Sequence, residues 1–437
     1  MIFLYVSLLL SWMKAEPIYL IEIFRYGARV QKSHVDNSDP FYIPGEITSV
    51  GLKQHFLLGK QIRKDYSQLF GDKYSSQRHQ VYSSNQNNTI TSAYAHLFGQ
   101  YELESGVELE ANVPSLFNPP IEDFDIPFEG TSALPHKFMP ISVISSEKGR
   151  NLLFGENCKC LTDMERHFQK KREKFTDDFE PLKNSLIEAG FNPEDFNGYI
   201  FDVKTLLEAC DYIIARSYYD SKFKKYPEII DQCDFLNNVV YSYFSTNTTI
   251  TKIANTSLFR LISKRLSKID QSSEKVISIS ALDTNFYYIL SLFFPENHEC
   301  ALNLYKKKYD EKNFNSFFEK SCLDSIKFAS SLLIEVSNDS EGGKFVSLRL
   351  NGEYLTPFNG EKSIKLPSFL TLLRDNSEKK YDALCLGIVE EISRGLSFVW
   401  IVTLFMILIE IGFLLFTMLK NKNEQMKDYN EFIINNF

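Results

Sequence analysis

Residues 17–24 read PIYLIEIF and run directly into Arg25-Tyr26-Gly27-Ala28-Arg29. The apolar run is typical of a buried strand, and the glycine that follows it marks a turn. Arg25 and Arg29 are therefore expected at the carboxyl end of a sheet, which is the edge where open α/β sheets bind ligands. Guanidinium groups match phosphate or carboxylate oxygens in a bidentate way. The stretch predicts an α/β sheet with an anion site at its edge, and the alternative is two ordinary surface arginines.

Strands and helices alternate along the rest of the chain. GLKQHFLLGKQIRKDY (51–66) has apolar residues at helical spacing, and a short strand followed by a helix is expected between residues 79 and 101. VISISA (276–281) predicts another buried strand, which would bring Asp283 to the same sheet edge as the two arginines. A hairpin is expected over residues 331–350, because two strand-like runs flank an Asn- and Gly-rich turn.

Length and composition are those of a globular protein with more than one lobe. The chain has 437 residues, of which 44% are hydrophobic and 24% charged, which excludes a disordered chain, a collagen and a multi-span transporter. Residues of about 162–268 are helical in pattern and highly charged, which predicts a helical cap on the α/β core. A net charge of −8 argues against a nucleic-acid partner.

Two apolar segments predict the location of the protein. Residues 2–12 (IFLYVSLLLSW) are too short to span a bilayer and favour a signal peptide over residues 1–15, with a buried first strand as the alternative. Residues 397–419 contain 23 residues with Glu410 as the single charge. A helix of that length reaches roughly 34 Å, enough to cross a hydrocarbon core of ~30 Å. Two lysines follow this span, so the charge bias places the C-terminus in the cytoplasm.

The expected organisation is a single-pass type I membrane protein. Residues 16–396 would form an endolysosomal lumenal or extracellular domain, and residues 420–437 a cytoplasmic tail. All seven cysteines lie in the predicted lumenal part, where most are expected in disulfides. No cysteine pair has zinc-finger spacing, and neither a metal nor a cofactor is predicted. Glycosylation is expected at the four N-x-S/T triplets that begin at Asn87, Asn247, Asn255 and Asn338.

Six segments, in order between about residues 18 and 356, carry a resemblance to one family. They read IFRYGARV, EITSVGLKQHFLLGKQIRKDY, NTITSAYAHLFGQY, VISISALDTNFYYIL, FASSLLIEVS and FVSLRLNGEYL. They resemble the histidine acid phosphatases, the branch of the histidine phosphatase superfamily that includes prostatic and lysosomal acid phosphatases. The first segment is similar to the RHGxRxP signature of the family, and the fourth to the strand that ends in SAHDTTL. The resemblance implies a phosphoglycerate mutase-like three-layer α/β core with a mixed, mainly parallel sheet.

The catalytic positions depart from the pattern of that family. The histidine of RHG, which attacks phosphorus in the family, is replaced by Tyr26, and the phosphate-binding histidine of the HD pair is replaced by Leu282. Asp283 matches the proton donor of the family. A phenol, with a pKa of ~10, needs an activating base or a strong positive field to attack phosphorus. Loss of one hydrogen-bond donor to the transition state typically costs about 10²–10³ in rate. The substitutions predict negligible catalysis.

The resemblance also implies a phosphate cradle and a disulfide. Arg25 and Arg29 match two phosphate-binding arginines, whereas the position of a third arginine falls on Tyr82, which leaves the cradle incomplete. The family pairs a cysteine in the region of Cys158 and Cys160 with one near the end of the catalytic domain, where Cys385 lies. One of the first two is therefore expected to pair with Cys385, and Cys160 is the expected partner.

The expected function is that of a catalytically impaired pseudophosphatase. Its ectodomain would bind phosphate or another small anion, or an unidentified protein partner as a receptor, adhesion or scaffold protein does. The alternative is an active acid phosphatase that hydrolyses phosphomonoesters in an acidic or extracellular compartment with relocated catalytic groups. His79 and His34 are the candidates for such groups, and exposed loop histidines are the simpler interpretation of both.

Overall fold

The apolar run of residues 17–24 forms strand β1 (Pro17–Arg25), as its pattern predicts, and β1 lies inside a mixed sheet. The computed structural model describes residues 16–32, 43–109, 119–120, 126, 130–145, 153–154, 158–310, 322–358, 360–386 and 388–436. The chain divides into two units, Met1–Glu378 and Lys379–Phe437. The expected signal peptide over residues 1–15 and His34 lie outside the described residues.

The sheet of the first unit has parallel strands on one side of β1 and antiparallel strands on the other. Within the described residues, its strand order is β3-β2-β4-β1-β5-β6-β7, with β8 paired to β6. The parallel neighbours are β3 (Val143–Ser145), β2 (His79–Ser83) and β4 (Val276–Ala281). The antiparallel strands are β5 (Ser331–Asn338), β6 (Lys344–Leu350), β7 (Glu353–Tyr354) and β8 (Ser363–Lys365). The predicted α/β core and late hairpin are confirmed.

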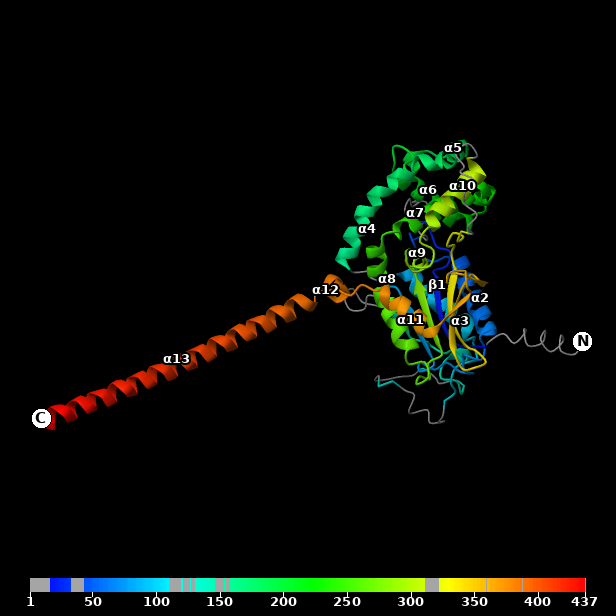
Figure 1. The fold of residues 1–437 in the computed structure, drawn as a ribbon. Helices are drawn as coiled ribbons and strands as arrows, with labels where there is room; N and C mark the ends of the chain where they lie inside the picture. Colours follow the sequence, from blue (N-terminus) through cyan, green and yellow to red (C-terminus); the bar gives the residue numbers. More distant parts are fainter. Residues whose placement is uncertain are drawn as a thin grey trace, which may run out of the picture. The chain divides into compact units, whose positions relative to one another are not determined.

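Helices cover both faces of the sheet, because successive side chains of a strand point to opposite faces. Leu20 and Phe24 of β1 pack against α2 (Ser49–Asp65) and α3 (Asn87–Gln100). Ile21 and Ile23 belong to the core cluster on the other face. That face is covered by α8 (Thr248–Leu266), α9 (Asp283–Leu290) and α11 (Leu366–Asp375). These layers give the expected helix–sheet–helix core (Figure 1).

A separate helical cluster forms the cap above the carboxyl ends of the parallel strands (Figure 1). Its apolar core joins α5 (Glu180–Glu188), α6 (Val203–Ser217), α7 (Pro227–Phe244) and α10 (Asn297–Tyr309). α4 (Lys159–Lys171) leads into this cluster. The expected cap range of 162–268 therefore needs a correction at its end. α8 packs on the sheet, whereas α10, which comes later in the chain, packs into the cap.

The described residues of the second unit form helices α12 (Tyr381–Leu386) and α13 (Ile388–Asn436). Residues Trp400–Asn423 of α13 are long and apolar enough to cross a membrane. This property rests on the length and composition of the segment, and its apolar side chains are exposed. The segment overlaps the expected span of residues 397–419.

Candidate functional site

The carboxyl ends of β1 and β4 bring Arg25 and Asp283 together. Arg25, the last residue of β1, is in register with Ala281 at the end of β4, and Asp283 is the first residue of α9. Nη2 of Arg25 donates a hydrogen bond to Oδ2 of Asp283 over 3.0 Å. The predicted meeting of these two side chains at one sheet edge is confirmed.

The loop that follows β1 is held against α2 and α3. Gly27 and Gly51 allow this close approach, because a Cβ added to Gly27 would lie 2.5 Å from the carbonyl oxygen of Gly51. The backbone N–H of Gly27 donates to Oγ of Ser92 over 3.1 Å, and that of Ala28 donates to Oε1 of Gln54 over 2.8 Å. Both helices therefore position Tyr26 and Arg29 relative to the sheet.

Tyr26 is fully buried, and its hydroxyl joins the two sides of the site. The hydroxyl donates to Oδ2 of Asp283 over 3.1 Å and accepts a hydrogen bond from Nε of Arg29 over 3.3 Å. Burial acts to raise the pKa of Tyr26, but the nearby positive charges, led by Arg29, outweigh burial and the charge of Asp283 and lower this pKa below its ordinary value. The phenol thus occupies the space between the arginines and the acid.

Asp283 is held in its ionised form. Its carboxylate accepts hydrogen bonds from Arg25, from Tyr26 and from the backbone N–H of Thr284. Burial acts to raise the pKa of Asp283, but the charges of Arg25, Lys32 and Arg29 hold that pKa well below its usual range. These charges and hydrogen bonds therefore favour the ionised form of the group in the proton-donor position.

Asp211 of the cap neutralises the second arginine, and sequence reasoning missed it. The Arg29 side chain is buried, and its Nη2 forms an ion pair with Oδ1 of Asp211 over 2.5 Å. Oδ2 of Asp211 also accepts the backbone N–H of Lys32 over 2.8 Å. A signal exists in the sequence, since Asp211 follows Leu207 and precedes Ile214 at helical spacing on one face of α6. Lys204 and Glu208 lie on the same face, so the pattern alone did not single out Asp211 as the partner of Arg29.

Leu282 completes an apolar wall beside the site. It is partly buried and packs against a cluster formed by Tyr26, Ala28 and Phe328. The Phe328 ring also lies over Arg25, with 4.7 Å between the guanidinium carbon and the ring centroid. An aliphatic side chain provides no hydrogen-bond donor, so position 282 cannot hold a phosphoryl oxygen.

Tyr82 is not part of this group, although its position matches that of a third arginine. It lies in the core cluster on the α8 face of the sheet, and its hydroxyl accepts a hydrogen bond from Arg265 over 3.0 Å and donates one to Gln80 over 2.7 Å. Tyr82 is in register with Ile279 of β4, two residues before the edge at Ala281. Counting residues along the segment placed Tyr82 at the position of the third arginine, but it did not show that the Tyr82 side chain points to the α8 face of the sheet.

The proposed replacement histidine is also elsewhere. His79 is buried, with Nδ1 3.1 Å from the hydroxyl of Tyr101 and Nε2 2.9 Å from Oγ of Ser278. Burial lowers the pKa of His79 to about 3, which keeps the ring neutral. The interpretation of His79 as an exposed loop residue is therefore wrong, and so is its placement in the pocket.

A cavity of about 400 Å³ opens between the sheet edge and the cap. Both basic and acidic side chains line it. The basic ones are Arg25, Arg29, Lys32, Arg172, Lys204 and Lys327, and the acidic ones are Glu208, Asp211, Asp234 and Asp283. Tyr26 and Asp283 raise the pKa of Lys32. Among the described residues, no group of three or more His, Cys, Asp or Glu side chains has the arrangement of a metal site.

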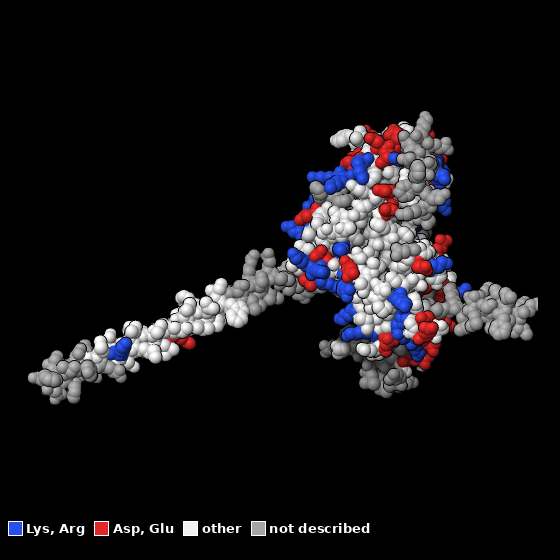
Figure 2. All heavy atoms as spheres, viewed as in Figure 1, with Lys and Arg blue, Asp and Glu red and all other residues white. Residues whose placement is uncertain are grey.

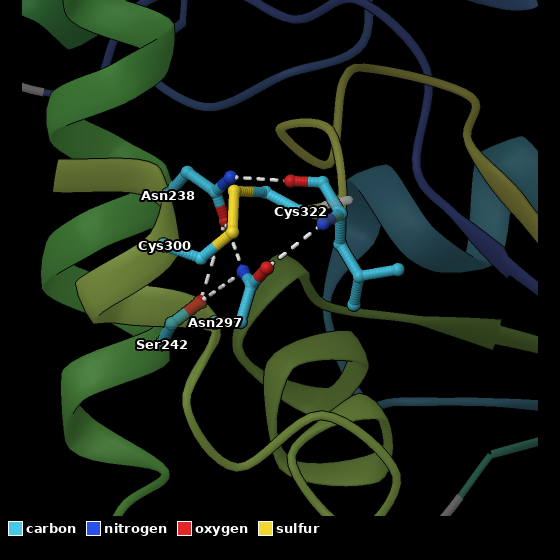
Figure 3. The surroundings of a disulfide bond; sticks show 6 residues. Asn238, Ser242, Asn297, Cys300 and Cys322 are labelled. Carbon is cyan, nitrogen blue, oxygen red and sulfur yellow. Dashed lines mark hydrogen bonds between the residues drawn. A yellow bond between two sulfur atoms is a disulfide. The ribbon is translucent and has the colours of Figure 1, made fainter. Parts of the chain in front are cut away.

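A disulfide lies just before the segment that forms one wall of the cavity. Figure 3 shows this disulfide and the hydrogen bonds around it. Cys322 pairs with Cys300 of α10, and the backbone of the next residue, Leu323, is bonded on both sides. Its N–H donates to Oδ1 of Asn297 over 2.9 Å, and its carbonyl accepts from Nδ2 of Asn238 over 2.7 Å. Residues 325–328, which follow directly, line the cavity. The carbonyl of Ile326 in this stretch accepts a hydrogen bond from Arg25.

The remaining cysteines correct one expectation. Cys160 carries a free thiol, whereas Cys158 and Cys385 are each disulfide-bonded. Cys158 is fully buried just before α4 begins, whereas Cys160 lies partly buried in the first turn of α4. The assignment of Cys160 to a disulfide was therefore wrong. A further disulfide joins Cys210 to Cys233 in the cap.

The four expected glycosylation sites differ in exposure. Asn87 and Asn338 are exposed and Asn247 is partly buried. Asn255 is 3% exposed, and its Nδ2 donates to the carbonyl of Tyr288 over 2.7 Å. A glycan on that nitrogen is incompatible with this packing, so the expectation for Asn255 was wrong.

Comparison with known proteins agrees with this architecture. The model of the histidine phosphatase superfamily (branch 2) matches residues 39–351. Lysosomal acid phosphatase of Xenopus laevis is 36% identical over 85 residues, which is 19% of this chain and 17% of the length of that relative. Phytase from Citrobacter braakii superimposes with a TM-score of 0.55 at 11% identity, over 84% of this chain and 99% of its own. Klebsiella sp. ASR1 phytase gives a TM-score of 0.54 at 11% identity, over 84% of this chain and 98% of the phytase chain. These structural matches show the fold alone.

Proposed function

Because this chain belongs to branch 2 of the histidine phosphatase superfamily, we propose that it keeps the phosphatase fold but binds an anion without turning over phosphomonoesters. The observation that carries the proposal is the Asp283 carboxylate, which accepts hydrogen bonds from both Arg25 and Tyr26. A group that protonates a leaving oxygen must itself carry a proton. The Asp283 carboxylate is ionised and already accepts hydrogen bonds from Arg25 and Tyr26, so it does not serve as that acid.

The residue in the nucleophile position is not available in the cavity, and no histidine of the described residues takes its place there. Tyr26 is fully buried, and it is not among the residues that line the cavity. None of the histidines in the described part of the chain lines the cavity either. Phosphoryl transfer needs an attacking group in line with the leaving oxygen. A bound phosphoester would therefore stay intact.

Anion binding is supported by the cations that no carboxylate neutralises. Arg25 and Arg29 are paired with Asp283 and Asp211, and Lys327 lies 3.4 Å from Asp234. Among the described residues, the other lining cations include Lys32 and Arg172, which have no ion-pair partner, and Nε of Arg172 is buried without a hydrogen bond. Unpaired donors of this kind attract phosphate or carboxylate groups.

The proposal places this domain on the lumenal or extracellular side of a membrane. The disulfides fit an oxidising compartment, and the exposed span at Trp400–Asn423 would anchor the chain. The protein is then a single-pass type I glycoprotein of the endolysosomal or plasma membrane, with glycans at exposed sites such as Asn338. The lysosomal acid phosphatase relative is in keeping with the endolysosomal choice.

Two measurements on the full-length protein in detergent test the proposal. p-Nitrophenyl phosphate near pH 5 should show no turnover above that of the Arg25→Ala variant. Calorimetric titration with inorganic phosphate should show binding that weakens about tenfold in Lys32→Gln, because a charge-assisted contact is worth on the order of 1.5 kcal/mol. Lys268→Gln, which removes an exposed lysine outside the cavity, is the matched control and should bind as the unmodified protein does.

Active catalysis is the second candidate, and one observation favours it. The positive charges around Tyr26 lower its pKa, which is what a phenolic nucleophile requires. Steady turnover that disappears in both Arg25→Ala and Tyr26→Phe, together with phosphotyrosine at Tyr26 during turnover, would establish this candidate. Steady turnover by the unmodified protein, together with equal phosphate binding in the unmodified protein and in Lys32→Gln, would also contradict the proposal.

A further inference from the structure

Helix α13 carries a regular polar stripe through its candidate membrane span. Between Ile401 and Leu419 the side chains that can form hydrogen bonds are Thr403, Glu410 and Thr417, and all the others are apolar or glycine. The three lie at intervals of seven residues. Residues seven apart on a helix fall on nearly the same face, so the three form one stripe along the span. The surface around them is exposed and largely without charge (Figure 2).

Glu410 needs a partner if α13 crosses a bilayer. A carboxylate near the centre of a span costs about 2.5–3.5 kcal/mol on insertion scales. No lysine or arginine lies between Gly395 and Leu419, so no basic residue of the span itself can neutralise it. Intramembrane acidic residues of this kind usually face another helix or a water-filled cavity.

We propose that two copies of this chain associate through parallel α13 helices, with the stripe of Thr403, Glu410 and Thr417 at the contact. A seven-residue repeat matches the left-handed crossing of most packed membrane helices. In a parallel pair, identical positions of the repeat meet across the interface. Each residue of the stripe thus meets a copy of itself.

The chemistry of the stripe fits a second copy better than a basic partner. A threonine hydroxyl both donates and accepts, and Thr417 already donates to the carbonyl of Leu414 over 2.8 Å, which leaves its oxygen free to accept. The carboxyl groups of two Glu410 side chains that face each other can form a hydrogen bond across the interface. A basic partner helix would satisfy Glu410 but would not require threonines at the same repeat position.

The first experiment measures association of the full-length protein in lipid bilayers by single-molecule photobleaching at several protein-to-lipid ratios. The unmodified protein should dimerise, and Glu410→Leu should weaken the dimer about 5- to 30-fold, the equivalent of one or two interhelical hydrogen bonds. Glu410→Gln should retain most of the association, since an amide still donates and accepts. Glu410→Leu combined with Leu408→Glu keeps the composition but moves the carboxyl off the stripe, and this matched control should stay dissociated.

The second experiment reports which face is in contact. Single cysteines are placed at Thr403 and at Val402 in the Cys160→Ser background, and each protein is oxidised in membranes. Thr403→Cys should form covalent dimers on a non-reducing gel, whereas Val402→Cys should not. Equal dimer formation at the two positions would overturn the proposal. So would an unmodified protein that stays monomeric, or one that associates only with a second protein bearing a basic residue in its span.

Discussion

The hydroxyl of Tyr26 lies 3.1 Å from Oδ2 of Asp283, and the same oxygen accepts a hydrogen bond from Arg25 over 3.0 Å. The hydroxyl also accepts from Arg29, which is paired with Asp211 of the cap. The residue in the nucleophile position therefore closes a network that includes both arginines of the opening motif. This network explains why restoring a single residue should not restore a phosphatase.

Tyr26→His alone should give no turnover of p-nitrophenyl phosphate at pH 5. Leu282 still supplies no hydrogen bond to the phosphoryl group, and Asp283 still forms its ion pair with Arg25. The loss of one transition-state donor typically costs about 10²–10³ in rate. The measurement is a steady-state assay of the folded variant, with the unmodified protein as the control. A variant that turns over steadily would show that Leu282 and Asp283 do not limit catalysis.

Tyr82→Arg should lower the free energy of unfolding by about 1–3 kcal/mol and should not strengthen phosphate binding. The new guanidinium would lie beside Arg265, which now donates to the Tyr82 hydroxyl, and it would face away from the cavity. Denaturant unfolding and calorimetric titration with phosphate measure the two effects. Tyr82→Phe, which removes only the hydroxyl, is the control for lost hydrogen bonding. A tenfold gain in phosphate affinity would place residue 82 in the site after all.

Stability should fall as the pH drops from about 6.5 to 5, because two buried histidines resist protonation. Burial lowers the pKa of both His55 and His79 to about 3, whereas the unfolded chain takes up these protons near pH 6.5. The unfolded state thus binds more protons in this window, and each histidine contributes a loss of about 1.4 kcal/mol per pH unit. His55→Phe should remove one such contribution from the slope. Urea unfolding at several pH values that gave the same slope for both proteins would contradict this.

Removal of the Cys300–Cys322 disulfide should affect both stability and the cavity. The bond closes a sequence separation of 22 residues, for which the chain-entropy model gives about 3 kcal/mol. The double variant Cys300→Ser, Cys322→Ser should therefore unfold at lower denaturant concentration. It should also bind phosphate more weakly at temperatures where it is fully folded, since residues 325–328 lose their anchor. Unchanged phosphate binding in the double variant would show that the disulfide does not position the cavity wall.

Asn338 should carry a glycan when the protein passes through the secretory route, and Asn255 should not. Asn338 is exposed, whereas Asn255 is buried and bonded to the backbone of Tyr288. Enzymatic deglycosylation in heavy-oxygen water, followed by peptide mass spectrometry, marks each occupied asparagine. Asn338 serves as the internal control for access to the glycosylation machinery. A heavy-oxygen label at Asn255 in folded protein would contradict the packing of α8.

Much of the fold could be predicted because its signals are local. The apolar run of β1 and the glycine-rich turn before β6 depend on residues within one strand or turn. The meeting of Arg25 and Asp283 followed from a general rule, since parallel strands end at one sheet edge. The apolar span in α13 was likewise evident from composition and length.

The direction of individual side chains and the partners of distant residues required the tertiary structure. Tyr82 had the expected position in the chain, but its side chain points to the opposite face of the sheet from Leu20 and Phe24. Asp211 reaches Arg29 across 182 residues of sequence, and no local pattern specifies which acid fills that place. The sequence alone therefore determined that a polar site forms at the sheet edge. Only the packing of the cap against that edge decided that Asp211 neutralises Arg29.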